Sequence, residues 1–297
     1  WTGTQSTDWN TASNWSPAEV PSETQNADIP ATASPPLISN AMNNPASCKA
    51  LIIRAGARLN LSSGTALTVH GDLTNYAGAT GLVIGNGASL ITLGAVNGQA
   101  TLQQTISGSC WHFISLLLTG ALAGTFTSQY LQQYSEATAT YSYITATGDP
   151  LYPMTGYAFW GVGPAFNAQY TGYPNTGNQF IALQRTADGN SYGWNLAGNP
   201  YPSAIDWDNV TASQFNNMAN AVYVYDNASQ TYQSYVGGIG SLTDGIIPPM
   251  QGFMVKASAA SPSLKLENQV RVHSAQSYYK STQSIENLLT LTVKGNA

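Results

Sequence analysis

Two aspartates two positions apart, Asp206 and Asp208, come closest to a chemical site in this chain. They lie in the stretch GWNLAGNPYPSAIDWDN, residues 193–209. An acid–base pair needs carboxylates that converge in a cleft, one of them desolvated so that its pKa rises. A calcium ion needs several oxygen ligands, which two aspartates and nearby backbone carbonyls supply. The spacing favours calcium over catalysis. The structural alternative is that Asp206 caps the following turn.

Other catalytic motifs do not occur in the sequence. It contains no HExxH sequence, no phosphate-binding glycine loop and no Ser/His/Asp arrangement. The three histidines, His70, His112 and His273, are far apart, which argues against a zinc site. We therefore expect a protein that is not an enzyme and that has no cofactor, unless calcium binds at the two aspartates.

Two cysteines, Cys48 and Cys110, leave two interpretations open. One is a single disulfide, which would form in an oxidising compartment. The other is a pair of separate buried thiols. The positions of the two residues in the sequence do not choose between these interpretations.

Aromatic residues indicate a second kind of site. Trp160, Tyr201 and Trp207 lie in segments rich in proline and glycine, where their rings could form a platform for sugar rings. In the alternative interpretation they pack on their own scaffold. The platform would belong to a glycan-binding module of a secreted carbohydrate-active enzyme.

The composition limits the partners that these sites can serve. Charged residues make up 8% of the 297 residues, and the net charge is -5 without a basic cluster. Such a surface does not attract the phosphates of nucleic acid or of an anionic membrane. The longest apolar stretch, residues 113–126, is too short to span a bilayer. The chain begins with Trp1 and without a signal peptide, so we expect a mature, processed chain or a fragment. Export would fit the composition.

Residues 1–105 are predicted to form a capped stack of β-rungs. Three tryptophans in a turn-rich opening are expected to plug the open end: Trp1, Trp9 and Trp15. Three apolar triplets each precede a glycine turn, at residues 51–53, 67–69 and 82–84. This weak repeat predicts a short parallel β-helix or solenoid.

A second repeat predicts two related antiparallel β-sandwich units, at residues 106–190 and 191–297. Three elements recur in the same order: CWHFIS and GWNLAG, YSEATATYSY and YDNASQTYQSY, YPMTGYAFW and PPMQGFMVK. A duplicated unit assigns Trp194 and the Pro-Met-x-Gly-aromatic element to cores and turns. It leaves SAIDWDN as a loop inserted in the second copy. The whole chain is thus expected to be all-β.

The motifs together resemble a known family. WTGTQSTDWNTASNWSPAEVP, CWHFIS, GWNLAGNPYPSAIDWD, PPMQGFMVKA and VRVHSAQSYYKS are similar to large surface proteins of Bacteroidota that the type IX secretion system exports. The resemblance implies a secreted or cell-surface, multi-domain protein associated with adhesion. It carries over no catalytic residues.

The function expected first is that of a secreted, non-catalytic structural or adhesion protein of the cell surface. Its partners would be other copies, other extracellular surface proteins or a polysaccharide, and neither nucleic acid nor a membrane interior. The alternation in LLTLTV, residues 288–293, predicts the start of a following strand that pairs with a neighbouring sheet edge. The alternative function is the glycan-binding module.

Overall fold

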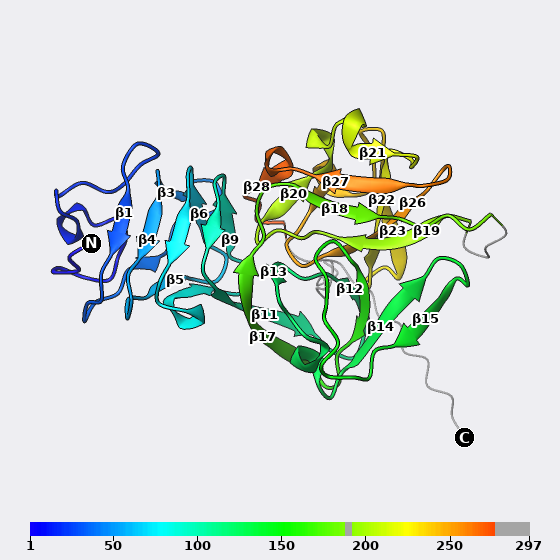
Figure 1. Cartoon of the computed structure of the whole chain (residues 1–297), viewed down its shortest axis with the longest axis horizontal. Coiled ribbons are helices and arrows are strands. Elements are labelled where there is room, and N and C mark those ends of the chain that lie inside the picture. Colours follow the sequence, from blue (N-terminus) through cyan, green and yellow to red (C-terminus); the bar gives the residue numbers. More distant parts are fainter. Residues whose placement is uncertain (188–191, 277–297) are drawn as a thin grey trace, which may run out of the picture.

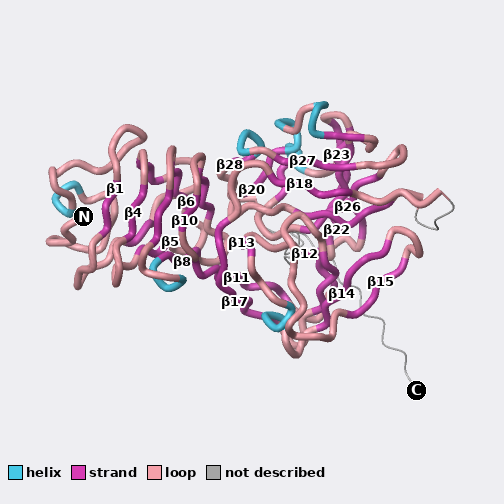
Figure 2. The backbone as a smooth tube through the Cα atoms, in the orientation of Figure 1, coloured by secondary structure: helices cyan, strands magenta, loops and turns pink. Residues whose placement is uncertain are grey.

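A computed structural model describes residues 1–187 and 192–276. These residues form a parallel β-solenoid of about three turns, followed by two antiparallel units (Figures 1 and 2). The helical elements of this part of the chain are short 3₁₀-helices: Ala12–Asn14, Ala79–Gly81, Ala123–Phe126, Trp207–Asn209, Ala212–Gln214, Thr243–Gly245 and Asn268–Val270. None of the described helices has the length and apolar character that a membrane crossing requires. The all-β fold class is confirmed, whereas the strand expected at 288–293 lies outside the described residues.

Three parallel sheets form the faces of the solenoid. The first contains β1 (Ala27–Ile29), β4 (Leu51–Ile53), β7 (Leu73–Asn75) and β10 (Val96–Asn97). The second contains β2 (Leu37–Ile38), β5 (Leu59–Leu61), β8 (Leu82–Ile84) and β11 (Ala100–Ser107). The third contains β3 (Ala46–Cys48), β6 (Ala66–Val69) and β9 (Ser89–Thr92). Most of these strands bury the residues on either side of a half-exposed one, because successive side chains point to opposite faces of a strand.

The three apolar triplets of the sequence lie on three different faces of the solenoid. They are contained in β4, β6 and β8, so they do not stack on one another. The residues that do stack from one rung to the next are pairs such as Leu51 and Leu73, or Leu59 and Leu82. The solenoid predicted from the triplets is therefore correct. The triplets themselves, however, are strands of three different sheets and not successive strands of one sheet.

The tryptophan cap is confirmed. Trp1, Trp9 and Trp15 are buried, and the ring of Trp15 lies edge-on to the other two, at centroid distances of 5.0 and 4.7 Å. Asn14 holds the loop around them, since its side chain accepts hydrogen bonds from two backbone N–H groups and donates one to a backbone carbonyl. The three indoles belong to the same hydrophobic core as the solenoid interior.

Strand β11 carries the solenoid into the first antiparallel unit, which we call unit 1. β11 pairs in parallel with β8 and antiparallel with β17 (Ala165–Pro174), which in turn pairs with β13 (Leu118–Thr119). One sheet and one core thus continue from the solenoid into unit 1. The predicted boundary at residue 105 falls inside β11.

The two units contain equivalent sheets, and this confirms the predicted duplication. In unit 1 the strand order is β12 (Trp111–Ile114), β16 (Tyr157–Trp160), β14 (Tyr130–Ser135) and β15 (Thr140–Tyr143). In the second unit, unit 2, it is β19 (Trp194–Gly198), β26 (Gly252–Lys256), β22 (Ala221–Asp226), β23 (Thr231–Val236) and β24 (Ile239–Gly240). The three pairs of repeated motifs fall on corresponding strands and turns of these sheets.

Two smaller sheets cover the sheet of unit 2. One contains β18 (Gln179–Ala182), β27 (Ser263–Leu266) and β21 (Phe215–Asn216), and the other β25 (Ile246–Ile247), β20 (Ala204–Asp206) and β28 (Arg271–Val272). Their apolar side chains share a second core with β22 and β26. The expectation of a loop at SAIDWDN is wrong, because β20 pairs with strands on both sides. β18, which the sequence assigned to the first unit, pairs with β27 and lies in unit 2.

Candidate functional site

The two units contact each other through equivalent hydrogen bonds. The backbone N–H of Ser115 donates to the carbonyl of Met250 over 3.0 Å, and that of Gly198 donates to the carbonyl of Met154 over 2.9 Å. Ser115 and Gly198 each stand four residues after the first tryptophan of their repeat. Both methionines have a left-handed backbone, with φ of 60° and 62°. Reciprocal contacts of this kind define an approximate two-fold axis between the units.

Glycines keep the units close to each other. A Cβ at Gly156 would lie 2.6 Å from Cγ of Leu196, and a Cβ at Gly252 would lie 2.9 Å from Cβ of Phe113. Both glycines follow the Pro-Met-x sequence of their repeat. The turn of each unit can therefore lie directly against the first strand of the other.

A groove of about 390 Å³ opens where the two sheets meet. We call it the tyrosine groove. Its lining is four tyrosines, a tryptophan and a methionine: Tyr134, Tyr141, Tyr223, Tyr232, Trp194 and Met254. The first two come from the β14–β15 hairpin of unit 1 and the others from unit 2, so neither unit forms the groove alone.

The rings of the groove are held by contacts with one another. Tyr134 and Tyr141 face each other across their hairpin, with centroids 5.0 Å apart, and Trp194 lies 5.1 Å from Tyr223. The buried ring of Phe113 lies 6.2 Å from Tyr141. Tyr141 and Tyr232 nevertheless remain 37% and 46% exposed, which leaves ring surface available to a ligand.

Beside the groove the two repeats differ in the residue that lies two positions after the first tryptophan. Phe113 of unit 1 lies 5.9 and 6.3 Å from Tyr225 and Tyr232, the hairpin tyrosines of unit 2. The equivalent residue of unit 2 is Leu196, two positions after Trp194. A leucine is smaller than a phenylalanine, so Leu196 fills less space than Phe113 fills at the equivalent position of unit 1.

The groove is uncharged and can act as a binding site. Within the part of the chain that the structure describes, no aspartate, glutamate, lysine or arginine lines it. Burial raises the pKa of the phenols of Tyr141 and Tyr232, so both stay protonated and can donate as well as accept a hydrogen bond. The ammonium of Lys256 lies 5.2 Å from the ring centroid of Trp194. Such a site suits a neutral ligand that has both apolar faces and hydroxyl groups.

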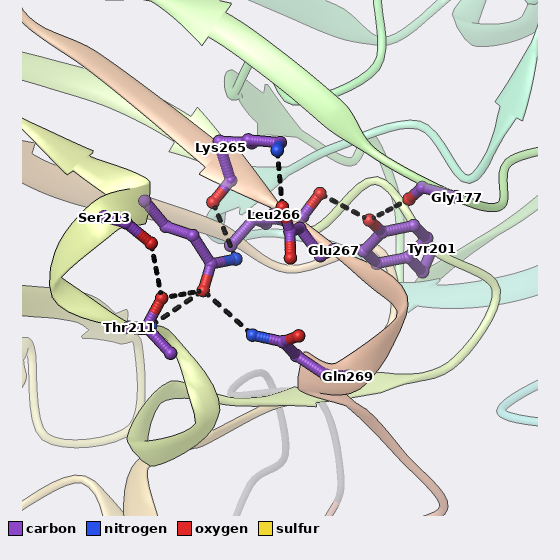
Figure 3. A network of polar contacts seen from close by, with 9 residues as sticks. Gly177, Tyr201, Thr211, Ser213, Lys265, Leu266, Glu267 and Gln269 are labelled. Atoms are coloured by element: carbon purple, nitrogen blue, oxygen red, sulfur yellow. Dashed lines mark hydrogen bonds and ion pairs between the residues drawn. The ribbon is translucent and has the colours of Figure 1, made fainter.

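Two of the three predicted platform residues are buried. Tyr201 is 0% exposed and Trp207 is 2% exposed, so the prediction that they stack on sugars is wrong. The phenol oxygen of Tyr201 lies 2.6 Å from the carbonyl of Gly177 and 2.9 Å from that of Leu266 (Figure 3). Trp207 packs against Phe253 in the core of unit 2. Trp160 is half-buried on β16.

The carboxylates of Asp206 and Asp208 accept intramolecular hydrogen bonds. Asp206 accepts one from the backbone N–H of Asp208 and another from the side chain of Asn209, both at 3.0 Å. Asp208 accepts one from the hydroxyl of Tyr235 at 2.6 Å. Among residues 1–187 and 192–276 no three His, Cys, Asp or Glu side chains are close enough to hold a metal. The capping role of Asp206 is confirmed, whereas a calcium ion held by the two aspartates and backbone carbonyls stays a prediction.

The cysteines are free thiols, so the disulfide prediction is wrong. Cys48 is buried on β3 in the solenoid, whereas Cys110 precedes β12 in unit 1. Sequence analysis missed that the sulfur of Cys110 lies 3.0 Å from Nε2 of His112. That nitrogen is also 2.9 Å from the carbonyl of Ser107, which can only accept a hydrogen bond. This contact favours the tautomer of His112 with the proton on Nε2, which then donates at that nitrogen, and burial raises the pKa of Cys110.

The GNPYPS stretch joins the solenoid to unit 2. The amide of Leu90 on β9 donates to the carbonyl of Pro202 over 2.6 Å. The buried guanidinium of Arg271 donates to the carbonyls of Leu90 and Thr92, both over 2.8 Å, and lies 4.8 Å from the ring of Tyr201. Burial lowers the pKa of Arg271 to about 10. This stretch is therefore scaffolding, because it accepts a backbone hydrogen bond from β9, a strand of the last rung of the solenoid.

The sequence motifs that contain the groove tyrosines could have predicted an aromatic surface, but they were used only to identify the repeat. YSEATATYSY and YDNASQTYQSY were matched to each other only as a repeat. In both, a tyrosine of the first strand is paired with one of the second, Tyr134 with Tyr141 and Tyr225 with Tyr232, which places the paired rings on one face of each hairpin. An exposed aromatic face on each of two facing hairpins is the signal for a groove between them.

The fold is that of an all-β protein in which a capped solenoid carries two related antiparallel units. The chain belongs to the family described as "Domain of unknown function (DUF8693)", whose model matches residues 1–239. Neither the comparison with curated proteins nor the comparison with solved structures found a match.

Proposed function

We propose that this chain is a secreted, non-catalytic adhesion protein of the cell surface that binds an uncharged glycan in the tyrosine groove. The observation that carries the proposal is the lining of the groove, which is aromatic and without charge. Sugar rings have apolar C–H faces that stack on aromatic rings, and their hydroxyls form hydrogen bonds with phenols. Protonated phenols are poor bases, which supports binding over catalysis.

The composition supports export and a neutral partner. Only 8% of the residues are charged, so amides, hydroxyls and aromatic rings must form much of the surface. The resemblance of GWNLAGNPYPSAIDWD and the other motifs to exported surface proteins of Bacteroidota supports a place outside the cell.

The binding proposal is tested by calorimetric titration of neutral and anionic oligosaccharides into the purified chain. We expect a neutral one to bind and an anionic one to bind weakly or not at all. Tyr141→Ala and Tyr232→Ala should each weaken binding about tenfold, the loss of one stacking contact. Tyr76→Ala, which removes a 65% exposed tyrosine of the solenoid, is the matched control. Equal affinity of all four proteins would contradict the proposal.

A second candidate function, self-assembly, is favoured by one observation. β15 is the outermost strand of its sheet, and its four residues are exposed. An edge of this kind can accept an extended strand of another copy or of another surface protein. Sedimentation of the intact chain and of Ser142→Pro tests this function. Loss of an oligomer in the variant would support it, and a monomer in both would contradict it.

A further inference from the structure

A row of aromatic side chains crosses three strands of the unit 1 sheet. Trp111 on β12 is paired with Trp160 on β16, which is paired with Tyr130 on β14. The rings of Trp111 and Trp160 are 5.5 Å apart, and Tyr130 is 51% exposed. We call these three residues the aromatic row.

The row lies on the face of the sheet that forms one side of the tyrosine groove. Alternate residues of a strand point to the same face, so Tyr130 and Tyr134 share one face of β14. Tyr143 lies 6.1 Å from Tyr130, and two residues before it Tyr141 lines the groove. Aromatic side chains therefore continue from the row into the groove.

The fold does not require aromatic residues in this row. In unit 2 the residue paired with Trp194 is Lys256, as Trp160 is paired with Trp111 in unit 1. The equivalent of Tyr130 is Ala221, four positions before the first tyrosine of its repeat. The same sheet thus forms in unit 2 with lysine and alanine at these positions. The strand order of the sheet therefore does not depend on aromatic side chains at Trp160 and Tyr130.

We propose that the aromatic row extends the tyrosine groove into a site for a neutral polysaccharide chain rather than a short sugar. This inference rests on the proposed function. Adjacent strands lie about 4.8 Å apart, so the paired residues of the row place aromatic rings side by side, and successive sugar rings can lie on them. β12, β14, β15 and β16 contain no aspartate, glutamate, lysine or arginine, which suits an uncharged polymer.

The test uses the whole chain and exchanges the row for its counterpart in unit 2. The variant carries Trp160→Lys and Tyr130→Ala, residues that the equivalent sheet already accommodates. Binding is measured to insoluble cellulose, chitin and starch by sedimentation, and to the matching tetrasaccharides by calorimetry. Thermal unfolding checks that the variant is folded, and Phe180→Ala, which removes an exposed ring from β18, is the control.

Three outcomes separate the inference from the function on which it rests. If the exchange weakens polymer binding about tenfold or more and leaves tetrasaccharide binding unchanged, the row extends the site. If neither binding changes, the row is no part of the site, while glycan binding in the groove stands. If the unaltered chain binds neither polymer nor tetrasaccharide, both the proposed function and this inference are overturned.

Discussion

Ser115 and Gly198 occupy equivalent positions in the two units and meet where the units are closest. A Cβ at Gly198 would lie 2.2 Å from Cβ of Ser115, while the hydroxyl of Ser115 donates to the carbonyl of Asn199. There is room for one side chain at this point of the two-fold axis and not for two. The repeats have therefore diverged to serine in one copy and glycine in the other.

Gly198→Ala is expected to destabilise the chain by about 1–3 kcal/mol, because the added methyl group overpacks the interface. The free energy of unfolding in urea measures the effect. Ser115→Gly should recover part of the loss in the double variant, since it removes the opposing Cβ. Gly148→Ala is the matched control, because no atom lies within 4 Å of a Cβ at that position. An effect of equal size in the control would show that the crowding at Ser115 is not the cause.

Leu196→Phe is expected to close the tyrosine groove. The new ring would take the place that Phe113 takes beside the hairpin tyrosines of the other unit. We expect the affinity for a neutral oligosaccharide to fall about tenfold or more, by loss of the stacking contact. Calorimetry gives the affinity and thermal unfolding gives the stability. Leu196→Met, which conserves volume, should leave the affinity nearly unchanged, and an equal loss in both variants would contradict the role of volume.

The joint between the solenoid and unit 2 is expected to weaken in acid. Nδ1 of His273 lies 2.7 Å from the hydroxyl of Ser89, and Nε2 lies 2.8 Å from that of Thr68. Burial and the neighbouring charge of Arg271 lower the pKa of His273 from 6.5 to about 4. Between these values the unfolded chain binds the additional proton, so the free energy of unfolding falls as the pH falls through this range.

Urea unfolding across that pH range, repeated with His273→Gln, measures the contribution of the imidazole. Glutamine can still form hydrogen bonds with the two hydroxyls but does not titrate. The difference in unfolding free energy between the two proteins should therefore change with pH. A constant difference would exclude His273 as the titrating group.

The two thiols are expected to react at different rates. Cys48 is 0% exposed, and burial raises the pKa of its thiol to about 12, so it should stay unmodified in the native chain. Cys110 is half-exposed and should react first with a maleimide. Intact mass after short and long labelling, with and without a denaturant, counts the modified thiols. If neither thiol were labelled until a reductant was added, the result would contradict free thiols and support a disulfide.

The features that the sequence predicted well are those set by local pattern or by comparison of two segments. The Trp1 cap follows from its turn-rich surroundings, and the duplication follows from three motifs in order. Burial of Tyr201 and Trp207 was not predictable, because it depends on contacts with strands remote in sequence, such as β27 and β26. The groove was not predictable either, because its prediction requires the knowledge that the β14–β15 hairpin of unit 1 lies next to the strands of unit 2.

The number of rungs in the solenoid sets the distance between the tryptophan cap and the tyrosine groove. Trp9 and its neighbours close one end, and β11 passes into unit 1 at the other, so neither end of the stack is an open template for further strands. Each rung contacts only the rungs next to it. A chain with one rung more would hold the same binding groove about 4.8 Å farther from the cap, with both ends unaltered.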